Sequence, residues 1–226
     1  LGSMKLRAKT SQATLAENLL DGEHTASTKE LLALCRSEDR FLGHAAISAL
    51  GKKIASISHA EANNLSTNDQ ISLLVALRRI DPTNTNWVNY FLGKDDPEIR
   101  FETLRWISES RLNDFRDVVE SMASNPKLDY KSFEAALATI NTLAGNPEAG
   151  VADPAMLIAR IGDKNAPSRV RAYALRLLNP QSNEFKKPLW QSLIATGDEE
   201  ILRELTRALS ANQTDDARKL LFDLAE

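Results

Sequence analysis

The sequence predicts an all-α fold, an α-solenoid in which antiparallel helix pairs stack one after another. The first observation is a twelve-residue sequence motif, which we call the phrase. It recurs at 39–50, 96–107, 167–178 and, more loosely, 198–209. In each copy the residues three, seven, ten and eleven places after the first are apolar, except Thr103. This spacing places them on one side of a helix. A helix pair cannot bury that side alone, so neighbouring pairs must stack and share a core.

The second observation is the composition. The chain has 226 residues, of which 42% are hydrophobic, and it contains nine glycines and eight prolines. Alanine and leucine dominate the segments between these breakers, which favours helices joined by short turns and essentially no strand. The net charge of -3 is close to that of ordinary globular proteins, whereas a dedicated nucleic-acid binder is strongly basic. No apolar run approaches the roughly 18 residues of a membrane span, so we expect no membrane insertion.

Caps and breakers predict each helix in the first half of the chain. Thr10 or Ser11 can cap a first helix that Gly22 stops, and Asp81 with Pro82 ends a helix that starts at Thr67. Pro97 occupies the first helical position of the clearest phrase. The expected helices lie at 11–22, 27–36, 39–57, 58–65, 67–80, 84–92 and 97–107.

The second half continues the same alternation of phrase helices and partner helices. The expected helices lie at 115–125, 130–143, 154–161, 167–178, 182–196, 198–209 and 214–224, and we expect about twelve or thirteen helices in the whole solenoid. The stretch 144–150 is rich in turn residues and has no periodicity. We therefore predict one domain over 5–226, with a subdomain seam at 144–153.

The first four residues, Leu1 to Met4, are typical of a remnant left by an expression vector. We therefore expect residues 1–4 to lie outside the domain, and the chain to be a part of a longer protein.

The phrase also carries the candidate site residues. Arg100 lies one helical turn after Asp96, and Arg171 takes the same place after Pro167. An Asp at the start of a repeat helix accepts backbone N–H groups, and an Arg in the first turn can reach it or the Asp of a neighbouring repeat. This pattern predicts an inter-repeat ladder, with anion binding as the alternative. The candidate concave-surface or inter-repeat contacts are Asp96, Arg100, Arg105, Arg171 and Arg176.

A positive edge and several aromatic residues leave nucleic-acid binding open as a second function. The basic residues of this edge are Arg169, Arg171, Arg176, Lys186 and Lys187. Aromatic side chains beside them would act as stacking platforms for bases only if they were exposed. We expect the large aromatics Trp87, Trp106, Tyr173 and Trp190 to lie in the core instead, which favours protein binding over nucleic-acid binding.

The chain shows no pattern that points to catalysis. Its one cysteine, Cys35, follows three leucines and is expected to be a buried thiol. The histidines His24, His44 and His59 have no spacing that would put two imidazoles on one metal ion. The sequence also lacks the serine-hydrolase elbow, the phosphate-binding loop and the dinucleotide fingerprint. We expect no catalytic residue, no metal and no cofactor in this chain.

Three stretches resemble the HEAT repeats of one family. These are 96–116, 131–138 and Arg169 to Pro180, and Leu104-Arg105-Trp106-Ile107 is the most specific part. The family comprises the large modular proteins of planctomycetes and their relatives, which join a dehydrogenase-like β-propeller, a HEAT-repeat region and a c-type cytochrome. The resemblance covers about residues 80–210 and implies a HEAT-like, right-handed α-solenoid.

The resemblance also implies a role and a compartment. The chain would be the helical spacer or docking module of a periplasmic or otherwise extracytoplasmic electron-transfer protein, with its flanking domains or another protein as partner. Without that relation, a cytoplasmic location is the expectation. Haem attachment in the family needs Cys-x-x-Cys-His, and this sequence has only Cys35, so no haem residue carries over. A further alternative is an oxidoreductase that is active only with its flanking modules.

Overall fold

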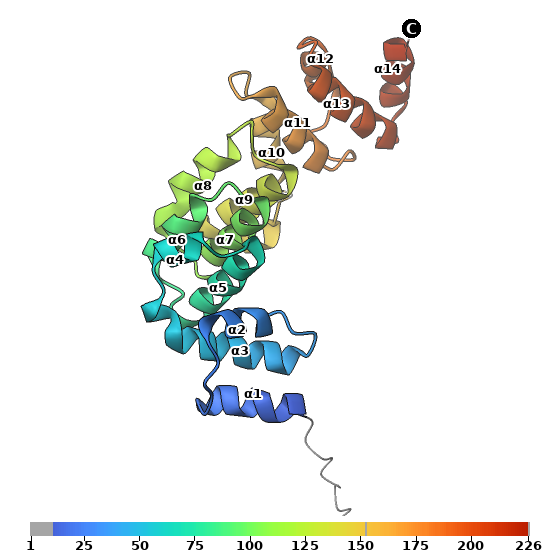
Figure 1. Ribbon diagram of the computed structural model, residues 1–226. Helices are drawn as coiled ribbons and strands as arrows, with labels where there is room; N and C mark the ends of the chain where they lie inside the picture. Colours follow the sequence, from blue (N-terminus) through green and yellow to red (C-terminus); the bar gives the residue numbers. More distant parts are fainter. Residues whose placement is uncertain (1–10, 152, 226) are drawn as a thin grey trace, which may run out of the picture. The chain divides into compact units, whose positions relative to one another are not determined.

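The structure is a computed structural model that describes residues 11–151 and 153–225 (Figure 1). Within these residues every regular element is helical, with fourteen α-helices, three short 3-10 helices and no strand. This confirms the predicted all-α class, with slightly more helices than expected. Residues 1–4, predicted to be a vector remnant, lie outside the described residues.

The chain divides into two compact units between Trp106 and Ile107. The first contains α1 (Ser11–Asp21), α2 (Thr28–Leu34), α3 (Arg40–Lys53), η1 (Ile54–Ser56), α4 (His59–Asn63), α5 (Thr67–Ile80), α6 (Thr85–Leu92) and most of α7 (Pro97–Glu109). The second contains the end of α7 with η2 (Asn113–Phe115), α8 (Arg116–Ala123), α9 (Tyr130–Leu143), η3 (Pro147–Ala149), α10 (Pro154–Gly162), α11 (Ser168–Leu177), α12 (Lys187–Ile194), α13 (Glu199–Ala211) and α14 (Asp215–Ala225). The segment 144–153, where we predict a seam, lies inside the second unit around η3.

The recurring phrase forms α3, α7, α11 and α13, and its apolar positions are the buried ones. Fifteen of the sixteen positions belong to the buried set, and only Leu177 is half-exposed. Thr103, the polar exception, is fully buried because its hydroxyl donates to the Ile99 carbonyl at 2.7 Å. The phrase therefore set the register of all four helices correctly.

In the first unit α3 packs against α1, α2 and α5. Gly51 permits the close approach of α3 and α5, because a Cβ there would lie 2.2 Å from Cγ1 of Ile80. Arg36, which follows α2, donates to the Leu32 carbonyl and to Asp69 of α5. α3 is thus held between α1 and α5, and α2 also contacts α5.

The second unit repeats this pattern of contacts. α11 packs against α10 and α13, and α13 packs against α11, α12 and α14. Arg160 of α10 bonds Glu120 of α8 at 2.6 Å. The phrase helices α11 and α13 therefore lie side by side, each with a partner helix next to it in the chain (Figure 1).

Two helices have different bounds in the structure from those predicted. The helix expected over 39–57 is α-helical only to Lys53 and continues as the 3-10 helix η1. The helix expected over 182–196 begins at Lys187, because turn bonds such as that from the Phe185 amide to the Ser182 carbonyl hold the preceding residues. Pro188 suits the first turn of α12, where a missing N–H costs nothing.

Candidate interaction surface

Asp96 is a helix cap, as the sequence predicts for an Asp at the start of a repeat helix. Its Oδ1 accepts from the amides of Glu98 at 2.9 Å and Ile99 at 3.1 Å. Its Oδ2 accepts from the Thr67 hydroxyl of α5 at 3.0 Å. Asp96 therefore satisfies first-turn donors of α7 and also ties α7 to α5.

Arg100 and Arg105, the other candidates on α7, pair with acids that are close in the chain. Arg100 contacts Asp95 at 3.1 Å, and that carboxylate is fully exposed. Arg105, whose side chain is half-exposed, lies 4.0 Å from Glu102. Arg100 thus contacts the residue that precedes the cap of its own helix.

Arg171 has a different place, although it takes the same phrase position as Arg100. It is 7% exposed, and its Nε donates to the Ile161 carbonyl near the end of α10 at 2.9 Å. The pKa of Asp198, the cap of α13, is lowered mainly by a hydrogen bond from Ser168, with the charge of Arg171 as a smaller cause. Arg171 thus donates to the end of α10, and its charge also acts on Asp198 at the start of α13, the next phrase helix.

Arg176 is exposed and lies on an aromatic cluster. Its guanidinium carbon stands 4.4 Å from the centre of the Tyr130 ring. Tyr130 meets Tyr173 edge to face at 5.2 Å, and Tyr173 also contacts Phe133. Burial is the main cause that raises the pKa of Tyr130 to about 12, and a hydrogen bond with Glu134 adds to it. Tyr130 therefore stays neutral near pH 7, and its ring makes a cation–π contact with the Arg176 guanidinium.

The exposed side of α11 and α13 carries alternating charges. Arg169 donates to Glu200 at 2.9 Å, which raises the pKa of Arg169. Arg207 pairs with Glu204 at 2.7 Å and donates to the Arg176 carbonyl at 2.9 Å. A shallow cavity of about 310 Å³ lies here. We define the α11–α13 face by its lining residues Arg169, Tyr173, Arg176, Glu200, Arg203 and Glu204.

The predicted site residues thus separate into three settings. Asp96, Arg100 and Arg105 lie on α7, Arg171 is buried against α10, and Arg176 is on the α11–α13 face. Sequence reasoning missed Tyr130 and placed Tyr173 in the core, whereas Tyr173 is half-exposed. The available signal was the phrase itself, because Tyr173 lies four residues after Arg169 and three before Arg176, on the same side of α11.

The face offers arginine forks, a phenol and carboxylates, which suit recognition of another protein surface. Among the described residues, no group of three or more His, Cys, Asp or Glu side chains could hold a metal ion.

Cys35, which follows α2, is half-buried rather than fully buried, and burial raises the pKa of its thiol to about 11. The thiol is therefore protonated near neutral pH and a poor nucleophile.

No helix in the described part of the chain has the length and apolar character needed to cross a membrane. Comparisons with protein-family models, with curated proteins and with solved structures found no match to this chain.

Proposed function

We propose that this chain is a non-catalytic scaffold, a HEAT-like α-solenoid that binds protein through the α11–α13 face. The observation that carries the proposal is the side-by-side packing of two phrase helices with a half-exposed tyrosine and exposed arginines on one side. Arginine and tyrosine are the side chains enriched at binding hot spots.

The solenoid part of the proposal rests on the packing pattern. In the first unit α3 contacts both α1 and α5, and in the second α13 contacts both α11 and α14. Contacts of this kind between successive helices are typical of repeat architecture, in which stability is a sum of local terms.

Native-state hydrogen exchange tests the solenoid. Leu205→Ala leaves a cavity beside α13, and we expect it to release amides of α12–α14 while α8 and α9, which belong to the same unit, keep their protection. An equal loss of protection in every helix would instead indicate one cooperative core and would contradict the solenoid.

The charge pattern of the face favours protein over nucleic acid. Arg169 and Arg203 of the face, and Arg207 beside it, each pair with a glutamate of α13, whereas Arg176 lies over the Tyr130 ring. A surface that binds nucleic-acid phosphates needs cations that are not already matched by carboxylates. The partner we propose is therefore a protein surface of mixed charge, either a flanking domain of the same polypeptide or a separate protein.

The resemblance to HEAT regions of modular cytochromes supports a finer proposal. The chain would be a spacer or docking module of an extracytoplasmic, haem-containing electron-transfer protein. Reading the gene on both sides tests this directly. A Cys-x-x-Cys-His segment on one side and a propeller on the other are expected, and finding neither would remove the electron-transfer assignment.

Calorimetry tests the binding face. Segments encoded on either side of this chain are expressed separately and titrated into it, and a duplex DNA is titrated at low and at physiological salt. We expect Arg203→Ala to weaken protein binding about fivefold, and the matched control Arg218→Ala to leave it unchanged. Both arginines are exposed and pair with an acid on their own helix. Equal effects, or salt-sensitive binding of DNA alone, would contradict the proposal.

A further inference from the structure

One cavity of the second unit has cations as its only charged lining residues. It has a volume of about 310 Å³ and lies where α10 and α12 end, beside the first turn of α11. Its lining residues are Gly162, Lys164, Arg171, Ser192, Ala195 and Thr196. None of these is an Asp or a Glu, so the wall carries two positive charges and no carboxylate.

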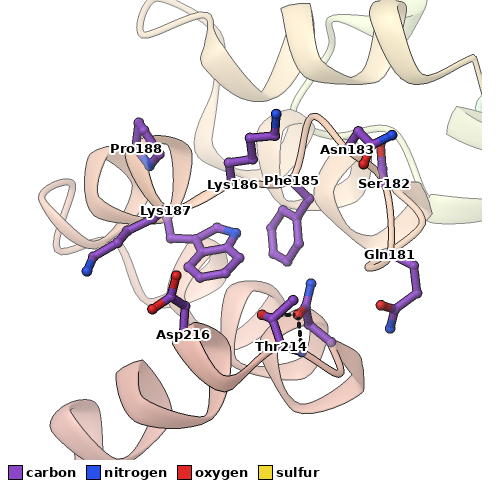
Figure 2. A pocket seen from close by; sticks show the side chains of 11 residues that line it. Gln181, Ser182, Asn183, Phe185, Lys186, Lys187, Pro188, Thr214 and Asp216 are labelled. Carbon is purple, nitrogen blue, oxygen red and sulfur yellow. Dashed lines mark hydrogen bonds between the residues drawn. The ribbon is translucent and has the colours of Figure 1, made fainter.

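Two other cavities of this unit differ in charge. The α11–α13 face has three arginines but also two glutamates. The cavity at the start of α12 is larger, about 430 Å³, and Asp216 lies in its wall. Figure 2 shows the ammonium ends of Lys186 and Lys187 pointing away from its centre. Of these three cavities, only the one at Arg171 has positive charges without a carboxylate in its wall.

Arg171 is a nearly buried cation with unused hydrogen-bond donors. It is 7% exposed, and among the described residues only its Nε–H has a hydrogen bond, to the Ile161 carbonyl at 2.9 Å. Its two Nη atoms are absent from the fully enclosed polar atoms that lack a partner, so solvent reaches them. Because Arg171 lines the cavity and is otherwise covered, these N–H groups open into it. A buried charge is destabilising unless an opposite charge pairs with it.

The carboxylates of the adjoining segments are engaged elsewhere. Asp198, the cap of α13, accepts a hydrogen bond from Ser168, and Arg171 acts on it through its charge. Asp163, which follows α10, accepts from the Asn165 amide at 2.9 Å. Neither carboxylate lines the cavity, and among the described contacts neither forms an ion pair with Arg171.

Two helix C-termini lie beside the cavity, and their partial negative charge opposes an anion. Their last carbonyls are already bonded, however. Arg171 covers the Ile161 carbonyl of α10, and amides of the turn after α12 donate to the end of α12. The bonded carbonyls of α12 are those of Gln191, Leu193 and Ile194. The Nη groups thus bond no carbonyl of the described helices and remain available to a ligand.

We propose that this cavity binds a small oxyanion, a phosphate or a carboxylate. The anion accepts from the Nη groups of Arg171, whose planar fork matches two oxygens of either ligand. Lys164, at the exposed edge, adds a second positive charge. The hydroxyls of Ser192 and Thr196 donate to carbonyls of α12 at 2.7 and 2.6 Å, so recognition falls to the two cations.

The cavity has room for such a ligand beside Arg171. Gly162 and Ala195 contribute little side-chain volume to the wall, and a Cβ at Gly162 would meet no atom within 4 Å. The site shares no residue with the α11–α13 face. Anion binding here is therefore independent of protein binding on that face.

NMR of the ¹⁵N-labelled chain tests the site. The probes are inorganic phosphate and acetate, each replacing sodium chloride at constant ionic strength. We expect saturable shifts of the Arg171 Nε–H signal and of the Gly162, Lys164 and Thr196 amides with at least one probe, while the amides of α8 and α9 stay in place. The ion that binds more tightly identifies phosphate or carboxylate as the preferred ligand.

Two variants at Ala195 locate the site without changing Arg171, whose bond to Ile161 also supports the fold. Ala195→Glu adds a carboxylate to the wall and should weaken binding of the tighter ion about tenfold. Ala195→Gln has nearly the same size without the charge and should leave binding unchanged. The position is exposed, so neither variant should change the melting temperature in chloride.

A second comparison concerns the lysine. Lys164→Gln should weaken binding about threefold, because an exposed charge contributes modestly. The matched control Lys127→Gln, at an exposed lysine of the same unit, should have no effect. The proposal fails if neither ion produces a saturable shift, or if Ala195→Glu and Ala195→Gln weaken binding equally. Equal effects of the two lysine variants would also overturn it, since they would indicate general screening of the surface charge.

Discussion

The first turns of α7 and α11 come from the same phrase, but their caps and their arginines make different contacts. In α7, Asp96 caps the helix and Arg100 pairs with exposed Asp95. In α11 the cap position is Pro167, which offers no side-chain bond, and Arg171 is buried against the Ile161 carbonyl. The phrase therefore determines which side of a helix is buried, whereas the helices around it determine what each arginine does.

The largest expected effect is at Arg171. Arg171→Met fills much of the same space but leaves the Ile161 carbonyl without its donor, and it should lower the free energy of unfolding by about 2–3 kcal/mol. Urea denaturation measures this. Arg203→Met, at an exposed arginine of α13, is the matched control and should cost less than about 0.5 kcal/mol. Equal losses would mean that burial does not distinguish the two arginines.

A smaller effect is expected at the cap of α7. Asp96→Ala removes the acceptor for the amides of Glu98 and Ile99 and should cost about 1 kcal/mol. Asp96→Asn, which keeps a capping oxygen, should recover most of that loss in the same denaturation experiment. If Asp96→Ala left the free energy of unfolding unchanged, the Asp96 cap would not be a stabilising difference between α7 and α11.

The exposed pair beside that cap should matter still less. Asp95→Ala removes the carboxylate that Arg100 contacts, but this carboxylate is fully exposed. Exposed ion pairs contribute little, so we expect a change below about 0.5 kcal/mol, and smaller at high salt. A loss as large as that at Arg171 would show that the two arginines are equivalent after all.

The smallest effect is a dependence on pH. The hydrogen bond from Ser168 and the Ile201 amide lower the pKa of Asp198 below its ordinary value. Because the folded pKa is depressed, this contribution is present above the unfolded pKa of about 4 and is lost as the pH falls through the folded value. Urea midpoints measured between neutral and acidic pH should therefore fall less steeply for Asp198→Asn than for the unmodified chain.

The all-helical fold and the register of the phrase helices were predictable because both depend on local periodicity. Thr103 shows how this works even at a polar position, since its hydroxyl bonds one turn back along its own helix. The partners of the arginines were not predictable in the same way. Arg169 reaches Glu200, and Arg207 reaches the carbonyl of Arg176, each 31 residues away in the chain. Such contacts depend on how successive helices pack.

The aromatic residues make the same point. Burial of Trp87, Trp106 and Trp190 follows from their size and apolar character. Whether a buried indole finds an acceptor depends on a distant backbone carbonyl: Trp106 finds one at Pro82, whereas Trp190 finds none among the described residues. Tyr173 stays half-exposed because it lies on the charged side of α11. Its contact with Tyr130 covers only part of the Tyr173 ring.

The most direct test of the proposed interaction surface is a binding footprint. Backbone amide signals of the ¹⁵N-labelled chain are followed while the separately expressed flanking segments are added. We expect the largest shifts on α11 and α13, around Arg169, Tyr173, Arg176 and Arg203. Shifts confined to α1–α3, or no shift with any flanking segment or protein partner, would contradict the claim that this face is the scaffold's binding surface.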